Sequence, residues 1–151
     1  MRVLIQRVDE ALVTVDGEKI AAIGKGLLAF VGIEENDTEK DAEWLAGKTA
    51  SLRIFDDEKG IMNLSVMDIN GEILVVSQFT LCAMTHKGNR PSYVKAAKPG
   101  KAIPLYEFFC QTLSTKIGKQ VKTGIFGAHM KIALVNNGPV TIWIDSKNPL
   151  S

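Results

Sequence analysis

Cysteine and histidine are scarce in this chain of 151 residues, and their spacing excludes several kinds of site. The two cysteines, Cys82 and Cys110, form neither a Cys-x-x-Cys pair nor a disulfide framework. The two histidines, His86 and His129, belong to no His-Glu-x-x-His or paired-ligand spacing. We therefore expect no metal ion, and we expect two half-buried thiols in a reducing compartment.

Long apolar runs are also missing. No stretch approaches the roughly 18 apolar residues that span a bilayer, and the apolar run within residues 1–7 is too short for a signal peptide. No linker, low-complexity segment or repeat divides the chain. Since 46% of the residues are hydrophobic, one core can form. We predict a single domain over residues 1–151 that is cytoplasmic and does not bind a membrane.

The common catalytic and nucleotide-binding motifs do not occur. No Gly-x-Ser-x-Gly surrounds Ser77, and the phosphate-binding Gly-x-x-x-x-Gly-Lys-Ser/Thr motif is absent. Gly24 and Gly26 form only a fragment of a dinucleotide fingerprint, and a strand pattern rather than a helix pattern follows them. We interpret these two glycines as turn residues. The sequence thus predicts no cofactor and argues against a serine triad.

Charge is distributed unevenly along the chain, although the net charge is only +1. Residues 1–72 contain 8 basic and 15 acidic side chains, whereas residues 73–151 contain 10 basic and 2 acidic ones. A positive face built from the second half would attract a polyanion such as RNA. Alternatively, folding mixes the two halves and the charges only solvate the surface. The sequence leaves both interpretations open.

Apolar patterns predict a sheet with two helices. The expected strands are 2–8, 11–15, 18–23, 26–33, 53–55, 72–81, 131–136 and 140–144, with the first ones arranged as a meander. One helix should run from a cap at Thr38 to about Ser51, and a second should cover residues 103–117 with Pro104 in its first turn. The predicted class is α+β, with a barrel-like or open sheet flanked by two main helices.

Three polar segments are candidates for chemistry. Residues 77–80 end a predicted buried strand, where backbone N–H groups can form an oxyanion hole. Residues 87–91 form a basic loop suited to phosphate. Residues 136–141 form a polar turn in which the Gly138-Pro139 bond can be cis or trans. Each segment also has an ordinary structural explanation: hydroxyl groups on a strand for 77–80, a solvated surface loop for 87–91 and a trans turn for 136–141. Composition does not decide between the functional and the structural explanations.

Taken together, six segments resemble the D-aminoacyl-tRNA deacylase family over nearly the whole chain. They are Ile5-Gln6-Arg7-Val8, Arg53-Ile54-Phe55 with Met62-Asn63-Leu64, Ser77-Gln78-Phe79-Thr80-Leu81, Gly88-Asn89-Arg90-Pro91-Ser92, Phe126-Gly127-Ala128-x-Met130 and Asn136-x-Gly138-Pro139-Val140-Thr141. Their order and spacing carry the resemblance. It implies a homodimeric hydrolase, with its active sites at the subunit interface, that cleaves the ester between a D-amino acid and the terminal adenosine of tRNA.

The resemblance also implies how D-amino acids are selected. A cis Gly138-Pro139 bond would protrude into the site formed by residues 77–80 of the other subunit. Its carbonyls would hold the substrate's amino group so that an L side chain would clash. Glycine would be admitted, so glycyl-tRNA mischarged on tRNA(Ala) is an expected substrate. Arg7 would brace this clamp, and Ala128 and Met130 would line the pocket.

Catalysis is assigned by the resemblance to Ser77, Gln78, Phe79 and Thr80. The first two would shape the pocket around the ester and the ribose, and the backbone N–H of Phe79 or Thr80 would stabilise the oxyanion. Because no base lies near Thr80 in the sequence, its hydroxyl is a poor nucleophile. We predict attack by water, assisted by the 2′-hydroxyl of the terminal ribose. A further expectation is that tRNA contacts Lys87 and Arg90.

One position departs from the family pattern, because Asn137 stands where the family commonly has Asp. A carboxylate role is lost there, while the turn geometry suits both residues. Two alternative functions remain. The protein could be a non-catalytic RNA-binding module, or a related editing deacylase that clears another mischarged tRNA. A cis Gly138-Pro139 bond favours the D-specific function over the second alternative.

Overall fold

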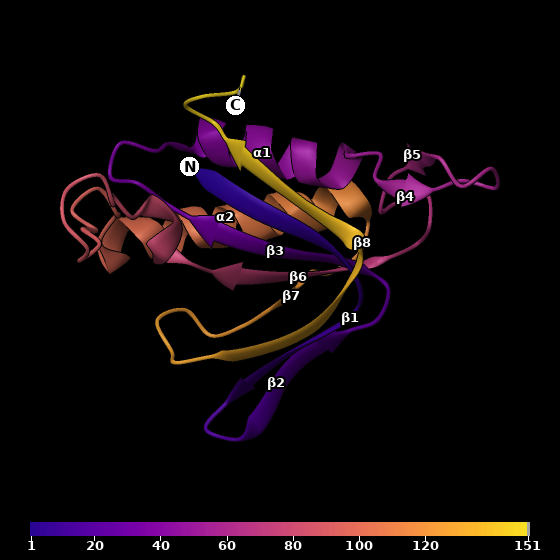
Figure 1. Ribbon diagram of the computed structural model, residues 1–151, viewed down its shortest axis with the longest axis horizontal. Coiled ribbons are helices and arrows are strands. Elements are labelled where there is room, and N and C mark those ends of the chain that lie inside the picture. Colours follow the sequence, from indigo (N-terminus) through magenta and orange to yellow (C-terminus); the bar gives the residue numbers. More distant parts are fainter. Residues whose placement is uncertain (151) are drawn as a thin grey trace.

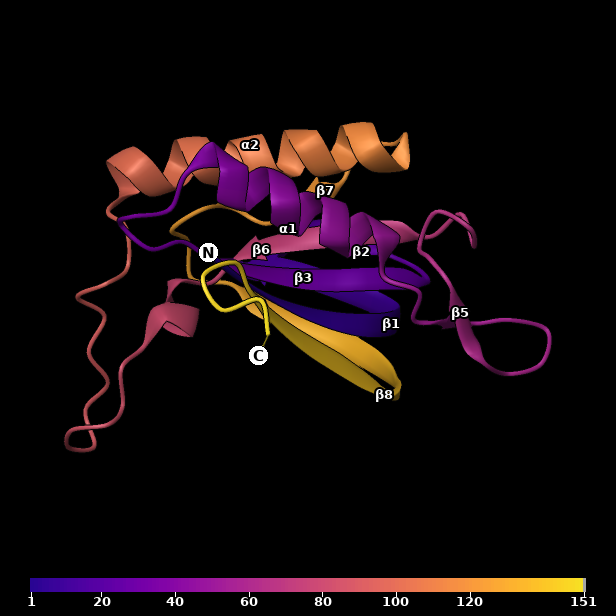
Figure 2. The same ribbon diagram turned by 90° about the horizontal axis from the view of Figure 1, so that it is seen from above.

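The computed structural model describes residues 1–150, which form a mixed sheet with two helices on one side of it (Figure 1; Figure 2). The main sheet contains β1 (Arg2–Val15), β2 (Glu18–Ile23), β3 (Gly26–Gly32), β6 (Glu72–Ser77), β7 (Lys122–Thr123) and β8 (Lys131–Asp145). The other elements are β4 (Phe55–Asp56), β5 (Met62–Leu64), the α-helices α1 (Glu39–Ser51) and α2 (Pro99–Ile117), and the 3-10 helix η1 (Phe79–Cys82). The predicted α+β class is confirmed, with a sheet that curls into a nearly closed barrel.

Strand β1 organises the sheet. Its first half pairs with β3, its second half pairs with β2, and β8 pairs with it along almost its whole length, all antiparallel. The parallel pairs β3–β6 and β6–β7 extend the sheet. The expected meander is wrong, because β3 returns to β1 rather than to β2. The long apolar run of β3 suits this inner position, since an inner strand can be covered on both faces.

Two hydrophobic clusters cover the two faces of β3. Leu27, Ala29 and Val31 face the layer between the sheet and the helices, where Leu45 of α1 and Phe109 of α2 are fully buried. On the other face, inside the curled sheet, the cluster is Val8, Ala11, Val13, Ile23, Leu28, Leu74 and Val76. The alternation of β3 residues between the clusters follows from the two-residue period of a strand.

Several predicted boundaries differ from the structure. The two strands expected within β1 are one strand, and so are the two expected within β8. β1 and β8 pair with each other on both sides of a bulge in the middle of β8. β5 and β7 are too short to carry a pattern, and β4 begins where the predicted strand 53–55 ends. Helix α2 starts at Pro99, whose fixed φ suits a first helical position, so Pro104 lies inside the helix.

The start of the chain is tied into the core by charge. The Met1 ammonium group donates to Asp37 Oδ1 at 2.5 Å and to Ser146 Oγ at 2.9 Å, and the ion pair is fully buried. Asp37 also accepts the Glu34 N–H at 2.7 Å. Thr38 caps α1 as predicted, and its N–H donates to Asp41 Oδ2 at 2.9 Å. These contacts hold the loop between β3 and α1 against both ends of the described chain.

Within residues 1–150, no helix is both long enough and apolar enough to cross a membrane.

The Asp41 carboxyl group should make stability depend on pH. Burial alone would raise its pKa, but hydrogen bonds from Ser146, the Thr38 N–H and Lys147 lower it from 3.8 to about 2. The ionised form therefore stabilises the fold above a pH of about 4, and this contribution is lost as the pH falls towards 2. Between about pH 5 and about pH 2.5 the free energy of unfolding, measured with urea, should fall for both proteins. The fall should be on the order of 1–2 kcal/mol smaller for Asp41→Asn than for the wild type.

Glu39→Gln is the matched control, because Glu39 is an exposed carboxylate in the same first turn of α1. It should follow the wild type over this pH range. Equal losses for the wild type and Asp41→Asn would contradict the prediction.

Candidate active site

A cavity of about 250 Å³ lies at the carboxyl end of β6. Five of the predicted site residues line it: Ser77, Gln78, Phe79, Ala128 and Met130. Its apolar lining comes from β3, β6, the start of α2 and the start of β8, through Val31, Ile33, Val76, Ala97, Ala102, Phe126 and Ile132. Residues from the middle and the end of the sequence thus form a single, mostly apolar pocket.

The polar wall of the cavity arises where β6 ends. The strand predicted to reach Leu81 stops at Ser77, and η1 begins at Phe79. Gln78 N–H donates to Val31 O at 2.7 Å, and the chain then crosses closely over Gly32. A Cβ on Gly32 would lie 2.9 Å from Leu81 Cβ, so a glycine is needed for this turn.

Thr80 lies beside the cavity rather than in its lining. It is exposed, and its Oγ1 accepts a hydrogen bond from Gln78 Nε2 at 2.5 Å. Phe79 and Thr80 open η1, and the first N–H groups of a helix have no acceptor within it. The backbone at these two residues therefore presents N–H donors close to the pocket.

The opposite wall follows a tight turn. Ala128 N–H donates to Ile125 O at 3.2 Å, and Gly127 has a positive φ of 79°. This turn places three consecutive residues, Ala128, His129 and Met130, in the lining of the cavity. The sequence reasoning named the first and the third but missed His129, because its spacing from His86 was tested only against metal-ligand patterns.

A second group of predicted residues lies at a bend in β8. Gln6 pairs with Thr141 and Val8 pairs with Asn136, so residues 137–140 stand opposite Arg7 alone. These extra residues leave the ladder as a bulge, in which Gly138 and Pro139 are exposed. The Gly138-Pro139 peptide bond is cis, and Gly138 has a φ of 134°.

Arg7 holds the base of this bulge. The residue is 9% exposed, and its guanidinium group donates to Asn137 O at 2.9 Å and to Ile54 O at 2.7 Å. It also pairs with Asp56 at 3.3 Å. Asn137 Nδ2 donates to Asp9 Oδ1 at 2.8 Å, a bond that an ionised Asp in place of Asn137 would not make. The departure from the family pattern is thus accommodated by Asp9.

The two groups of site residues lie at opposite ends of the sheet (Figure 1). Arg7 pairs with Leu27, and Leu27 pairs with Ile73, at the start of β6. Ser77 lies four residues further along β6. At ~3.3 Å per residue this is about 13 Å along the strand, before the spacing between strands is added. The bulge of one chain therefore does not line the cavity of the same chain.

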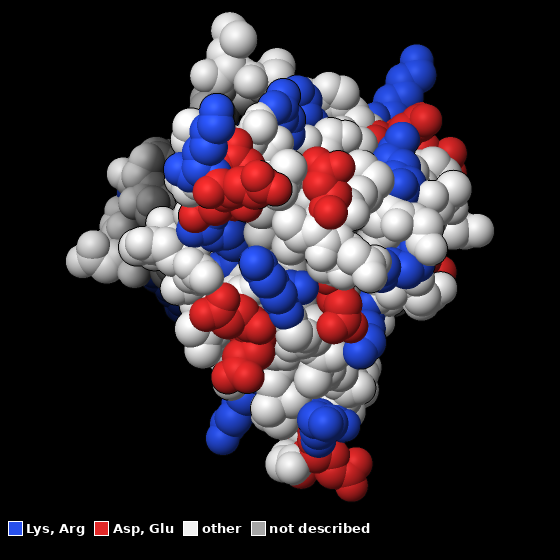
Figure 3. All heavy atoms as spheres, turned by 90° about the vertical axis from the view of Figure 1, so that its right-hand side faces the viewer, with Lys and Arg blue, Asp and Glu red and all other residues white. Residues whose placement is uncertain are grey.

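The predicted RNA-contacting residues, Lys87 and Arg90, are exposed on a loop closed by a bridge between Met84 and Ser92. Tyr93, just beyond the loop, packs edge-on against Phe79 with the ring centroids 5.0 Å apart. Tyr93 thus ties the end of this loop to a residue that lines the cavity. At the other end of the sheet, acidic and basic side chains are interleaved (Figure 3).

Ion pairs such as Lys122–Glu72 at 3.2 Å and Lys147–Asp41 at 3.0 Å also join the two halves of the sequence. Folding therefore mixes the charges in part. The segment between Glu72 and Glu107 contains no acidic residue, and its Lys87 and Arg90 are exposed.

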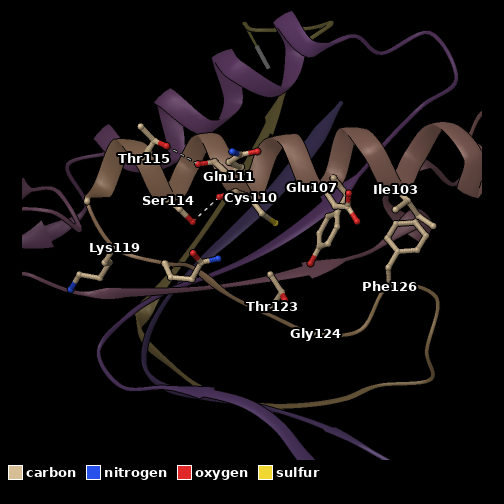
Figure 4. Close-up of a pocket in the computed structure, with 13 residues that line it drawn as sticks. Ile103, Glu107, Cys110, Gln111, Ser114, Thr115, Lys119, Thr123, Gly124 and Phe126 are labelled. Carbon is tan, nitrogen blue, oxygen red and sulfur yellow. Dashed lines mark hydrogen bonds between the residues drawn. The ribbon is translucent and has the colours of Figure 1, made fainter.

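A larger hollow of about 900 Å³ lies between α2 and β7 (Figure 4), and it contains none of the predicted residues. Two of its hydroxyl groups are bonded to the backbone: Tyr106 donates to Val75 O at 3.0 Å and Ser114 to Cys110 O at 2.8 Å. Burial raises the pKa of the Cys110 thiol to about 12, so it is a poor nucleophile.

The thiols of Cys82 and Cys110 were predicted to be half-buried, but both are buried. Residues 1–150 contain no cluster of three or more potential metal-binding His, Cys, Asp or Glu side chains.

Replacing Arg7 should loosen the bulge. In Arg7→Lys, one ammonium group cannot serve the carbonyls of both Ile54 and Asn137 in a fixed plane, so about 2–3 kcal/mol of unfolding free energy should be lost. Arg53→Lys is the control, because Arg53 is exposed and also donates to a backbone carbonyl, that of Asn63, at 2.8 Å. Arg53→Lys should lower the free energy of unfolding, measured with urea, by less than about 1 kcal/mol. Equal costs for the two variants would refute the bracing role.

Comparison with known proteins agrees with this geometry. Residues 4–145 match the family described as D-Tyr-tRNA(Tyr) deacylase. Proteins named D-aminoacyl-tRNA deacylase from Flavobacterium psychrophilum and Bacteroides thetaiotaomicron are 62% and 58% identical over 148 residues, 98% of this chain and 99% of each relative. The solved structure named c-Myc DNA Unwinding Element Binding Protein is 42% identical, with a TM-score of 0.91 and coverage of 96% of this chain and 98% of that one. A probable eukaryotic D-amino acid tRNA deacylase shares the fold at 17% identity, with a TM-score of 0.82 and coverage of 95% and 97%. As the resemblance predicted, the chain belongs to the D-Tyr-tRNA(Tyr) deacylase family.

Proposed function

We propose that the protein hydrolyses the ester bond of D-aminoacyl-tRNA and releases free tRNA and the D-amino acid. The observation that carries the proposal is the cavity at the end of β6. It brings together Ser77, Gln78 and Phe79 from one segment and Ala128 and Met130 from another. An apolar pocket with a few polar groups at one wall is typical of a small-molecule site, here for the aminoacyl end of the tRNA. The curated relatives bear the name of this activity.

The proposed enzyme is a homodimer in which each bulge enters the cavity of the other subunit. Gly138 and Pro139 are exposed and lie far from the cavity of their own chain, so they need a second chain to reach such a site. Among the described residues, β8 pairs with β1 alone, which leaves one long strand edge unpaired. A strand edge of this kind commonly associates with another chain. Exposed Val135 and Trp143 on the same strand add apolar surface for the contact.

In this dimer the bulge selects the chirality of the substrate. The backbone carbonyls at Gly138 and Pro139 hold the amino group, and an L side chain would then point into the bulge. The contacts of Arg7 with Asn137 keep the bulge in place. Glycine has no side chain to exclude, so the proposal includes glycyl-tRNA mischarged on tRNA(Ala) as a substrate.

Chemistry takes place at the other wall. The N–H groups of Phe79 and Thr80 open η1 and can donate to the tetrahedral oxyanion as it forms. Thr80 itself lies outside the lining, with its hydroxyl bonded to Gln78. We therefore assign the attack to water, held by the 2′-hydroxyl of the terminal ribose. Lys87 and Arg90 are exposed on the loop before Tyr93 and would contact the phosphates of the acceptor end. Since aminoacyl-tRNA is used in the cytoplasm, the proposal places the protein there.

A second candidate is nucleic-acid binding without catalysis. The solved relative at 42% identity is named as a DNA unwinding element binding protein, and the loop before Tyr93 is basic. That function predicts salt-dependent binding with no turnover. A related editing deacylase would instead cleave an L-aminoacyl ester. One assay separates all three.

The assay compares hydrolysis of D-tyrosyl-tRNA and L-tyrosyl-tRNA by the purified protein. We expect rapid hydrolysis of the D-ester, whereas the L-ester should be lost only at its spontaneous rate. The variant Gln78→Ala, purified in the same way, provides the background rate of ester hydrolysis. Survival of both esters together with RNA binding would support the binding function, and loss of the L-ester would support the other deacylase.

Thr80→Ala should remain active, within about tenfold of the wild type, because the hydroxyl contributes only a hydrogen bond to Gln78. Thr80→Ser is the matched control that keeps a nucleophile. If Thr80 formed an acyl-enzyme, the serine variant would work, the folded alanine variant would be inactive, and a covalent D-tyrosyl adduct of the wild type would be trapped by acid quench. Mass spectrometry and single-turnover rates distinguish the two mechanisms.

A further inference from the structure

The guanidinium group of Arg2 bonds to three separate segments of the chain, and one of them is η1. Its Nη1 donates to Leu81 O at 2.9 Å, its Nε donates to Asp145 Oδ2 at 3.2 Å, and its Nη2 lies 3.0 Å from Glu34 Oε1. Each nitrogen of the group therefore has a different partner. The guanidinium carbon also lies over the Trp143 ring, 5.8 Å from its centroid. A planar group with partners on three sides and on one face has a fixed position.

The bond to Leu81 lies at the end of η1 that points away from the cavity. A helix of four residues leaves its last carbonyl groups without a donor of its own, and Arg2 supplies the donor for Leu81 O. A cation also interacts favourably with the carbonyl dipoles at this end. The N–H groups of Phe79 and Thr80 open the same single turn. A shift of its last carbonyl therefore moves these N–H groups as well.

The sheet brings η1 within reach of Arg2. Arg2 pairs with Gly32 in the β1–β3 ladder, so the two residues lie side by side on one face. Gly32 has no side chain, and η1 fills the space beside Arg2: an added Cβ would lie 2.9 Å from Leu81 Cβ and 3.3 Å from Cys82 Sγ. Packing on Gly32 limits how closely η1 approaches the sheet. The bond from Arg2 limits how it slides or turns on that surface.

Two acidic side chains hold Arg2 in turn. Asp145 ends β8 and pairs with Arg2 in the ladder. Glu34 follows β3, just after Ile33, whose carbonyl accepts the N–H of Ala97 at 2.8 Å, and both of these residues line the cavity. Glu34 Oε1 is buried and has no hydrogen bond among the described residues, so the Arg2 ion pair compensates its charge. The three charged side chains are between 13% and 22% exposed, and water therefore screens them only in part.

We propose that Arg2 is a positioning residue for the reaction: it holds η1 so that the N–H groups of Phe79 and Thr80 meet the oxyanion as it forms. The inference rests on the proposed deacylase function. Arg2 is not part of the cavity lining, so it acts through η1. Oxyanion donors work only at hydrogen-bond distance from the oxygen of the tetrahedral intermediate, and a misplacement of about 1 Å can lower a rate about 100-fold. Arg2 therefore controls the rate of the chemical step rather than the binding of tRNA.

The test measures single-turnover hydrolysis of D-tyrosyl-tRNA by the wild type and Arg2→Lys over a range of enzyme concentrations. Lysine keeps the charge and can pair with Glu34, but one ammonium group cannot also serve Leu81 O and Asp145. The maximal rate should fall at least about tenfold, while the enzyme concentration that gives half of it changes less than about twofold. A loss of folded protein would do the reverse, because it raises the half-saturating concentration and leaves the maximal rate unchanged.

Two further variants complete the design. In Asp145→Asn the maximal rate should fall about two- to fivefold, since asparagine still accepts the Nε bond but has no charge. Combined with Arg2→Lys, it should cause little further loss, because both changes act through the same guanidinium group. Arg53→Lys is the control: Arg53 is exposed, donates to Asn63 O at 2.8 Å, and should match the wild type in both measurements.

An unchanged maximal rate in folded Arg2→Lys would overturn the proposal. If this variant does not fold, Asp145→Asn decides in the same way. A higher half-saturating concentration alone, increasing with salt, would show that Arg2 contacts the tRNA and would also overturn it. If the wild type itself leaves the D-ester intact, the proposed activity is wrong, which differs from an active wild type that Arg2→Lys matches.

Discussion

The pairing of β8 with β1 is the constraint on which the rest of the molecule depends. β1 is paired on both edges, by β8 on one side and by β3 and then β2 on the other. Its register therefore cannot slip without turning every apolar side chain to the wrong face. The extra residues 137–140 of β8 then have one place to go, outward opposite Arg7. The bulge, its brace and the start of β8 beside the cavity all follow from this single ladder.

The sequence predicted the local elements better than their partners. Helix α1 begins after Thr38 and ends at Ser51 as expected, because its cap and its apolar face are local signals. The return of β3 to β1 depends on contacts distant in sequence, which periodicity does not encode. The predicted end of β6 is too late, because Phe79 and Leu81 alternate with polar residues and so continue a strand pattern. The glycine that permits the turn, Gly32, belongs to a different strand.

The candidate site shows the same division. Physical patterns made residues 77–80 and 138–139 candidates, but only the resemblance decided between a functional and an ordinary structural interpretation of them. The structure adds that the two groups lie at opposite ends of the sheet, which depends on the register of its strands. The sequence did not predict that His129 lines the cavity, because only the fold brings residues 77 and 129 together there.

Separation of the two groups has a consequence for the proposed enzyme. One end of the sheet would supply the oxyanion donors, and the other end would supply the selector for a different subunit. A lone subunit would then have a pocket open to either chirality, and a general esterase acting on L-aminoacyl-tRNA would oppose translation. Placing the selector on the partner ties fidelity to association, since a pocket becomes complete only when the second chain binds. The interface would thus be under selection for specificity as well as for stability, and the unpaired edge of β8 lies beside the bulge that has to be placed.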